Sequence, residues 1–482
     1  MFKLTPLTAA ILVIISAQAL ADDSVSTQNQ VGTANIADVT QRVAPFSTAA
    51  QQQLGQGNDA AALQDNATSS IDQTQLGDYN AGYAEQLYEN GSTITQQQVG
   101  SFNISHASQS IGSTANEVLQ QQQGSGNFSF VYQDTQEGTS GKTFQFGDNN
   151  EANIEQIQYG IANNALIIQY GSTNDATAEQ ISHMSGQLGI NQYGEGNYAY
   201  GDQRNGHGGN LTINQFGGFN ASEVWQDAQT ASLATVNQYG QTNETVVDQS
   251  FGENNVAQVL QVGDLNAIYV DQFESMGSTL ALYQQGTGNV HFTYQSGDSH
   301  VLNATSVGNG NKVYASNWKG PQLGGQFGSN QRATINQNGT QNVASFTQDG
   351  IGHIMTTHQN GTGNKTTVSQ ADSYNELYFD QNGSDNILVA DQRGTTNLAQ
   401  GYSSGSGNST EFDQSDTGNR AYTAQMYGSD NQISVKQAGS MNVSYVTQGG
   451  TGNIANVDQS GMTQMATVQQ FGTANQASVL QQ

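Results

Sequence analysis

Residues 453–459 read Asn-Ile-Ala-Asn-Val-Asp-Gln, and this short pattern decides the fold of the chain. An asparagine opens it, small or apolar residues stand two and four positions later, and a glutamine closes it. The pattern recurs at residues 35–41 and 475–481, and a short glycine-containing arc usually joins one copy to the next. Such alternation is typical of a half-buried β-strand, and glycine permits the tight turn between strands.

One strand and one arc take about 11 residues, so two strands and two arcs make a rung of about 22 residues. A single rung is too thin to bury its apolar face, whereas a stack of rungs buries it between neighbours. We therefore expect an all-β fold, a cross-β-type β-solenoid of about 20 stacked two-strand rungs of roughly 22–23 residues. At roughly 4.8 Å per rung, this predicts one elongated body about 100 Å long.

The opening asparagine and closing glutamine of each strand point inward by this alternation, toward the corners where strand meets arc. A buried amide without a hydrogen bond costs about 1–3 kcal/mol, but stacked amides can bond their equivalents above and below. We expect structural ladders that include Asn35, Gln41, Asn58, Gln64, Asn80, Gln86, Asn197, Gln203, Asn266, Gln272, Asn386, Gln392, Asn453, Gln459, Asn475 and Gln481.

The N-terminal segment does not follow the repeat. Lys3 precedes an apolar run that is too short to span a bilayer, and residues 19–21 form a small-x-small cleavage site. These features are typical of a secretory signal peptide. We expect a signal peptide at residues 1–21, a short segment at 22–29, a repeat block at 30–297, an irregular stretch at 298–325 and a second repeat block at 326–482.

The irregular stretch departs from the pattern at several positions. His300 replaces the asparagine, Ser306 and Asn317 replace glutamines, and Pro321 cannot donate to a strand ladder. This stretch could be a bend or divider between two blocks. We favour the simpler interpretation, a tolerated loop insertion.

Composition excludes several classes of protein. The chain has 482 residues, no cysteine, 39 acidic and 11 basic residues, and a formal net charge of −28. Disulfide scaffolds and thiolate chemistry are excluded, and the scarcity of lysine and arginine argues against nucleic acid and anionic membranes as partners. The seven histidines show no metal-ligand spacing, and His300 and His353 occupy asparagine positions. We expect no enzyme activity, no cofactor, no metal site and no membrane insertion.

Aromatic residues recur after the strand-closing position in one part of the chain. Their spacing of 23–24 residues predicts a stacked column on one edge, worth about 1 kcal/mol per pair. This aromatic edge comprises Phe146, Tyr170, Tyr193, Phe216 and Tyr239. A purely structural column is the simpler interpretation, and lateral contact between fibres is the alternative.

An aspartate often stands just before the closing glutamine and points outward. We expect these aspartates to solvate the surface and to slow premature aggregation. A divalent-cation ladder is the weaker alternative. These positions are Asp202, Asp248, Asp271, Asp380, Asp391, Asp413 and Asp458.

The repeat resembles the curlin repeat of curli fibre subunits from Gram-negative bacteria, S-x5-Q-x-G-x-G-N-x-A-x3-Q. Residues 47–64 match every fixed position, and residues 192–203 and 448–459 match its second part. Serine-led arms recur at residues 69–75, 92–98, 232–238 and 278–284. The chain differs in having many more repeats, a short segment before the first strand, and asparagine where the family prefers serine.

The resemblance implies a secreted subunit that polymerises with itself into extracellular amyloid fibres, which form biofilm matrix and mediate adhesion. It also implies a nucleator subunit and an outer-membrane secretion pore as partners. From the sequence, the well-formed final strand at residues 475–481 favours a polymerising subunit. A monomeric solenoid adhesin or fibre-associated accessory protein is the alternative, and a β-helix polysaccharide enzyme would need a carboxylate cluster that the pattern does not specify.

Overall fold

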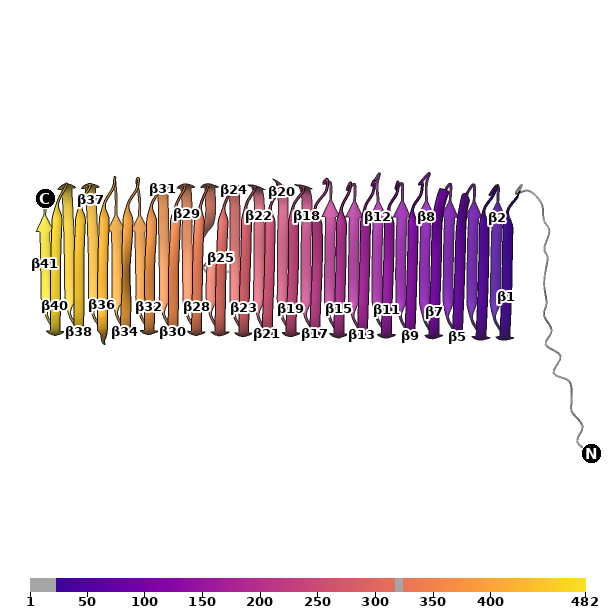
Figure 1. The fold of residues 1–482 in the computed structure, drawn as a ribbon, viewed down its shortest axis with the longest axis horizontal. Helices are drawn as coiled ribbons and strands as arrows, with labels where there is room; N and C mark the ends of the chain where they lie inside the picture. Colours follow the sequence, from indigo (N-terminus) through magenta and orange to yellow (C-terminus); the bar gives the residue numbers. More distant parts are fainter. Residues whose placement is uncertain (1–22, 317–323) are drawn as a thin grey trace, which may run out of the picture. The chain divides into compact units, whose positions relative to one another are not determined.

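The computed structural model describes residues 23–316 and 324–482, which form strands and no helix. The predicted signal peptide lies outside the described residues, as do Asn317 and Pro321. The chain divides into two compact units, Met1–Ser185 and Gly186–Gln482. Within each unit the strands lie side by side in sequence order and alternate between two sheets (Figure 1).

Unit 1 contains the first fourteen strands, and every second strand pairs in parallel with the next of its kind. The strands are β1 (Val25–Thr33), β2 (Ile36–Arg42), β3 (Thr48–Gln56), β4 (Asp59–Asp65), β5 (Thr68–Asp78), β6 (Ala81–Leu87), β7 (Asn90–Ser101), β8 (Ile104–Ser110), β9 (Glu117–Ser125), β10 (Phe128–Asp134), β11 (Ser140–Asp148), β12 (Glu151–Ile157), β13 (Asn164–Ser172) and β14 (Asp175–Ile181).

Unit 2 contains the remaining strands and follows the same plan. They are β15 (Gln187–Glu195), β16 (Tyr198–Arg204), β17 (Asn210–Gly218), β18 (Ala221–Thr230), β19 (Leu233–Gln241), β20 (Glu244–Glu253), β21 (Val256–Asp264), β22 (Ala267–Met276), β23 (Thr279–Thr287), β24 (Val290–Asp298), β25 (Val301–Asn309), β26 (Lys312–Ala315), β27 (Gly325–Ser329), β28 (Arg332–Thr340), β29 (Val343–Ile351), β30 (Ile354–Thr362), β31 (Lys365–Ser373), β32 (Glu376–Ser384), β33 (Ile387–Gln392), β34 (Leu398–Ser406), β35 (Ser409–Gln414), β36 (Arg420–Ser429), β37 (Gln432–Ser440), β38 (Val443–Thr451), β39 (Ile454–Met462), β40 (Met465–Thr473) and β41 (Gln476–Gln481).

Each unit is a β-solenoid whose rungs contain two strands and two arcs, so the predicted fold class is confirmed. Outside the irregular stretch, paired residues on successive rungs are 22, 23 or 24 positions apart, because the arcs vary in length. Along the strands of the inner rungs, more buried and more exposed side chains alternate, and the inward ones include Ile268 and Val270 on β22. A thin core of aliphatic side chains therefore lies between the two sheets, with polar ladders at its corners.

The irregular stretch lies inside unit 2 and leaves the stacking continuous. Strands β26 and β27 both pair with β24 on one side and with β29 on the other. Gln326 pairs with Gln295, 31 positions earlier, and with Gln348 on the following rung. The extra residues of this rung therefore fall between two halves of one interrupted strand.

Candidate functional site

Ladders of glutamine amides run along the inside of both units. Gln64 Nε2 donates to Gln86 Oε1 at 2.9 Å, and the same group donates to the Ser69 carbonyl at 2.9 Å. The bond to the backbone carbonyl fixes the orientation of the amide, and the bond to the next glutamine links two rungs. Because both side chains are fully buried, these hydrogen bonds satisfy groups that water cannot reach.

Asparagines form a second ladder at one corner, which we call the Asn corner: the position just before strands β2 and β4 and their equivalents. Every described rung has asparagine there. The backbone N–H and the Nδ2 group of Asn220 both donate to Asn197 Oδ1 at 3.1 Å, and Asn220 Nδ2 also donates to the Gly240 carbonyl. One short side chain thus links its rung to the rungs before and after it. This explains why asparagine recurs at a fixed spacing in the sequence.

The structure places every predicted ladder residue on the inward side of its rung. Those of the inner rungs are all 1% exposed or less, namely Asn58, Gln64, Asn80, Gln86, Asn197, Gln203, Asn266, Gln272, Asn386, Gln392, Asn453 and Gln459. Those of the first and last described rungs are more exposed, namely Asn35, Gln41, Asn475 and Gln481. Both end rungs therefore present amide groups that the inner rungs bury.

The opposite corner carries a mixture of residues, among them the serines that open the serine-led arms. This mixed corner, the position just before β3 and its equivalents, includes Ser232, Asn255 and Ser278 in unit 2. Ser232 Oγ accepts the backbone N–H of Asn255, and Asn255 Oδ1 accepts that of Ser278, both at 3.1 Å. Serine and asparagine are interchangeable here because each supplies one acceptor to the rung that follows.

The arc glycines allow rungs to approach more closely than other residues permit. Gly240 has φ of 123°, and a Cβ atom there would lie 2.0 Å from the carbonyl oxygen of Gly263 on the next rung. Both the backbone conformation and the close contact therefore require glycine at this position.

The predicted aromatic edge forms stacked pairs within each unit. In unit 1, the rings of Phe146 and Tyr170 have centroids 4.6 Å apart. In unit 2, Phe216 stacks between Tyr193 and Tyr239 with centroid distances of 4.9 Å on both sides. A similar column on the other sheet was not predicted from the sequence. Its rings, Tyr269, Phe292 and Tyr314, stack with centroid distances of 4.7 and 5.9 Å. These aromatic residues repeat every 22 or 23 positions near strand centres, and this spacing was the available sequence signal.

The outward aspartates have different environments. Asp248 and Asp271 occupy paired positions on β20 and β22, and burial together with the neighbouring carboxylate raises the pKa of Asp271 to about 7. Burial also raises the pKa of Asp248. Asp202 is only 3% exposed and forms an ion pair with Arg204, so it does not solvate the surface as predicted. Arginine two positions after Asp202 was the available sequence signal for this pair.

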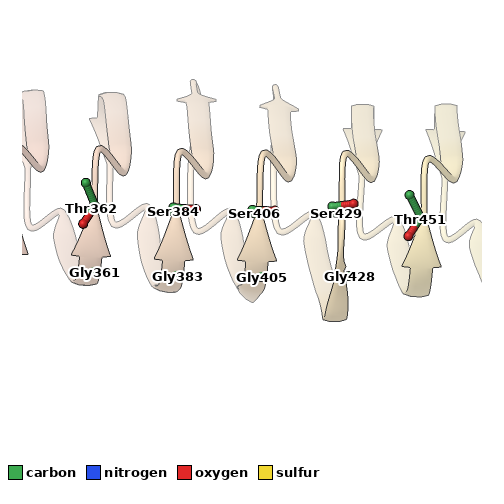
Figure 2. A pocket seen from close by; sticks show the side chains of 9 residues that line it. All are labelled: Gly361, Thr362, Gly383, Ser384, Gly405, Ser406, Gly428, Ser429 and Thr451. Atoms are coloured by element: carbon green, nitrogen blue, oxygen red, sulfur yellow. The ribbon is translucent and has the colours of Figure 1, made fainter.

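A shallow hollow of about 570 Å³ follows the arcs of β30, β32, β34, β36 and β38. Figure 2 shows its lining, in which each glycine is followed by a small hydroxyl residue such as Ser384 or Ser406. The lining contains no charged or aromatic side chain, so it offers hydroxyl groups and backbone only.

Within the described residues, no group of three or more histidine or acidic side chains has the arrangement of a metal site. The same residues contain no helix long and apolar enough to cross a membrane.

Comparison with known families finds the curlin-associated repeat at two places, residues 147–181 and 428–461. The first match runs from the end of β11 through β14, and the second from the end of β36 to β39. Each match therefore covers about one and a half rungs, with both kinds of amide ladder in it. No curated protein matches the chain.

Proposed function

We propose that this chain, which carries curlin-associated repeats in both of its solenoid units, is a secreted structural subunit that assembles with copies of itself into curli-like extracellular fibres. The repeat family and the solenoid fold both point to a structural protein. Biofilm matrix formation and surface adhesion are the roles that such fibres would serve. A signal peptide, a nucleator subunit and an outer-membrane pore belong to the same proposal.

The exposure of the terminal strands carries this proposal. All residues of β1 are exposed, and within the described residues β1 pairs only with β3. Strand β41 pairs only with β39 in the same part of the chain, and its side chains alternate between exposed and half-buried. A strand with one unpaired edge is a template for another strand, and parallel cross-β stacking satisfies such edges in fibres.

The two terminal rungs also match each other in register. If Gly472 on β40 is placed against Gly32 on β1, the same offset places Gln470 against Gln30 and Asn475 against Asn35. It also places Gln481 against Gln41, so both glutamine ladders and the Asn corner continue from one copy to the next. A second copy of this chain is therefore a partner that satisfies the exposed amides of both ends.

The decisive experiment follows thioflavin-T fluorescence of the purified chain at micromolar concentration, with fibre diffraction of the product. Assembly is expected to show a lag that the chain's own fibres shorten, and a meridional reflection at about 4.7–4.8 Å. In the parallel pairing of β41 with β39, Ile454 donates to the Asn475 carbonyl, so the backbone N–H of Ser478 faces the unpaired edge. Replacement of Ser478 by proline removes a backbone donor from this exposed edge and should slow seeding, whereas Ser478→Thr should not. A stable, β-rich monomer that never seeds would instead support a monomeric adhesin or accessory protein.

A further inference from the structure

Three consecutive rungs of unit 2 interrupt the serine and asparagine series of the mixed corner. The residues at this corner are His300, Gln331 and His353, and the exposed fraction of each is 0%. His300 Nδ1 accepts the backbone N–H of Gln331 at 3.3 Å, and Gln331 Oε1 accepts that of His353 at 2.9 Å. His353 Nδ1 then accepts the backbone N–H of Asn375 at 3.2 Å. The side-chain acceptor that each rung supplies to the next is therefore an imidazole nitrogen at two of these three positions.

Both imidazoles reproduce the hydrogen bonds of an asparagine amide at this corner. In a rung with asparagine, Asn397 Nδ2 donates to the Arg393 carbonyl four residues earlier, and its Oδ1 accepts the N–H of Asn419. His300 Nε2 lies 3.0 Å from the Ser296 carbonyl, also four residues earlier. His353 Nε2 lies 3.1 Å from the Asp349 carbonyl, in the same relation. Nε2 thus stands in for the amide nitrogen, and Nδ1 for the amide oxygen.

Only one protonation state of histidine can make this pair of hydrogen bonds. The neutral ring with its proton on Nε2 offers one donor and one acceptor in the required places. A doubly protonated ring has two donors, so its Nδ1–H would face the backbone N–H of the next rung. Asparagine cannot undergo this change, because its amide does not titrate in this range.

We propose that His300 and His353 make this corner of unit 2 a pH-sensitive joint, closed at neutral pH and opened in mild acid by protonation of the two imidazoles. Protonation removes the acceptor that holds Gln331 on one side and Asn375 on the other. The rungs from β25 to β32 lose two of their connections at this corner, while the Asn corner of the same rungs does not change.

The carboxylates around the two rings favour the protonation that opens the joint, whereas burial of the rings opposes it. Asp298 faces His300, while Asp349 and Asp372 face His353, and each carboxylate favours the charged ring. Burial outweighs these carboxylates and lowers the pKa of both histidines below the ordinary value of 6.5. In mild acid, the unfolded chain therefore binds more protons at these two histidines than the folded chain does. The contribution of the neutral rings to stability is lost as the pH falls below about 6.5.

Replacement of both histidines by asparagine tests the joint, because asparagine makes the same hydrogen bonds at neighbouring rungs without titrating. Thermal unfolding of the full chain would be followed by circular dichroism between pH 7.5 and pH 5.0. The melting temperature of the His300→Asn/His353→Asn variant, relative to that of the wild type, should rise by about 2–4 °C or more over this range. His358→Asn, which alters an exposed ring of the same unit, should not raise the melting temperature in acid. Parallel pH profiles for the wild type and the double variant would overturn the proposal.

A spectroscopic measurement decides the question without relying on the stability of a variant. Nitrogen-15 NMR of the chain labelled at histidine reports the protonation state of each ring, and the single variants assign the two signals by their disappearance. At pH 6, both rings are expected to be neutral with the proton on Nε2. Rings that titrate near pH 6.5, or that carry the proton on Nδ1, would overturn the proposal.

Discussion

The carboxyl groups of Asp248 and Asp271 occupy paired positions on the adjacent parallel strands β20 and β22, so two like charges face each other across one strand spacing. Burial and this neighbour raise the pKa of Asp271 to about 7. The folded chain therefore favours protonated Asp271, and this contribution to stability is present below the ordinary pKa of 3.8 and is lost as the pH rises toward 7. At this position, the stacked acidic side chains therefore stabilise unit 2 less at neutral pH than in mild acid.

Replacement of Asp271 by asparagine should remove this loss of stability at neutral pH. We expect the free energy of unfolding to rise by on the order of 1 kcal/mol at pH 8, after allowance for solvent screening, and to change little at pH 4. Urea unfolding at the two pH values measures the difference. Asp458→Asn is the control, because Asp458 pairs with Lys436 on the neighbouring strand and gains no such relief. An equal effect of Asp271→Asn at both pH values would contradict this prediction.

Loss of one glutamine from a ladder should be costly. Gln249 Oε1 accepts from Gln226 at 2.8 Å, and Gln249 Nε2 donates to Gln272 at 2.7 Å. Gln249→Ala leaves a buried donor on one side and a buried acceptor on the other, at an expected cost of about 2–4 kcal/mol in the free energy of unfolding. Gln258→Ala, at an exposed position on β21, should change it by less than about 0.5 kcal/mol. Similar denaturation midpoints for the two variants would show that the ladder contributes little.

The arc glycines should tolerate no side chain where rungs approach closely. Gly240→Ala forces a Cβ against the backbone of Gly263, and we expect loss of the folded unit or a fall in stability of at least about 3 kcal/mol. Gly189 lies in a strand, and a Cβ there meets no atom within 4 Å. Gly189→Ala should therefore stabilise unit 2 by about 0.5–1 kcal/mol. The melting temperatures of the two variants check this prediction, which fails if they shift in the same direction.

The aromatic edge gives a prediction that separates stability from fibre contact. Serine at positions Tyr193, Phe216 and Tyr239 removes two stacked pairs, which should cost about 1 kcal/mol for each pair. If the edge also mediates lateral contact, fibres of the triple variant should bundle less in electron micrographs. If the triple variant is less stable but its fibres bundle as before, the column has only a structural role.

The repeat predicts the solenoid, because the two-residue alternation and the fixed Asn-to-Gln spacing each require stacked rungs. It places Gln64 and Asn58 inward for the same reason. It does not predict the role of His353, because an imidazole at an asparagine position gains its meaning only from the backbone N–H that faces it. The ion pair that buries Asp202 also depends on local packing, since alternation alone places every such aspartate in water.

The amide ladders give each rung a direction. Gln86 Nε2 donates to Gln109, on the rung that follows, whereas Asn103 Nδ2 donates to Asn80, on the rung before. The two faces of a rung are therefore chemically different: one presents glutamine donors with asparagine acceptors, and the other presents the reverse. On the face that presents glutamine donors, a segment added in reverse orientation would bring donor against donor in the glutamine ladders and acceptor against acceptor at the Asn corner. Stacking of this repeat is accordingly directional, and the two ends of a stack differ through side chains that carry no charge.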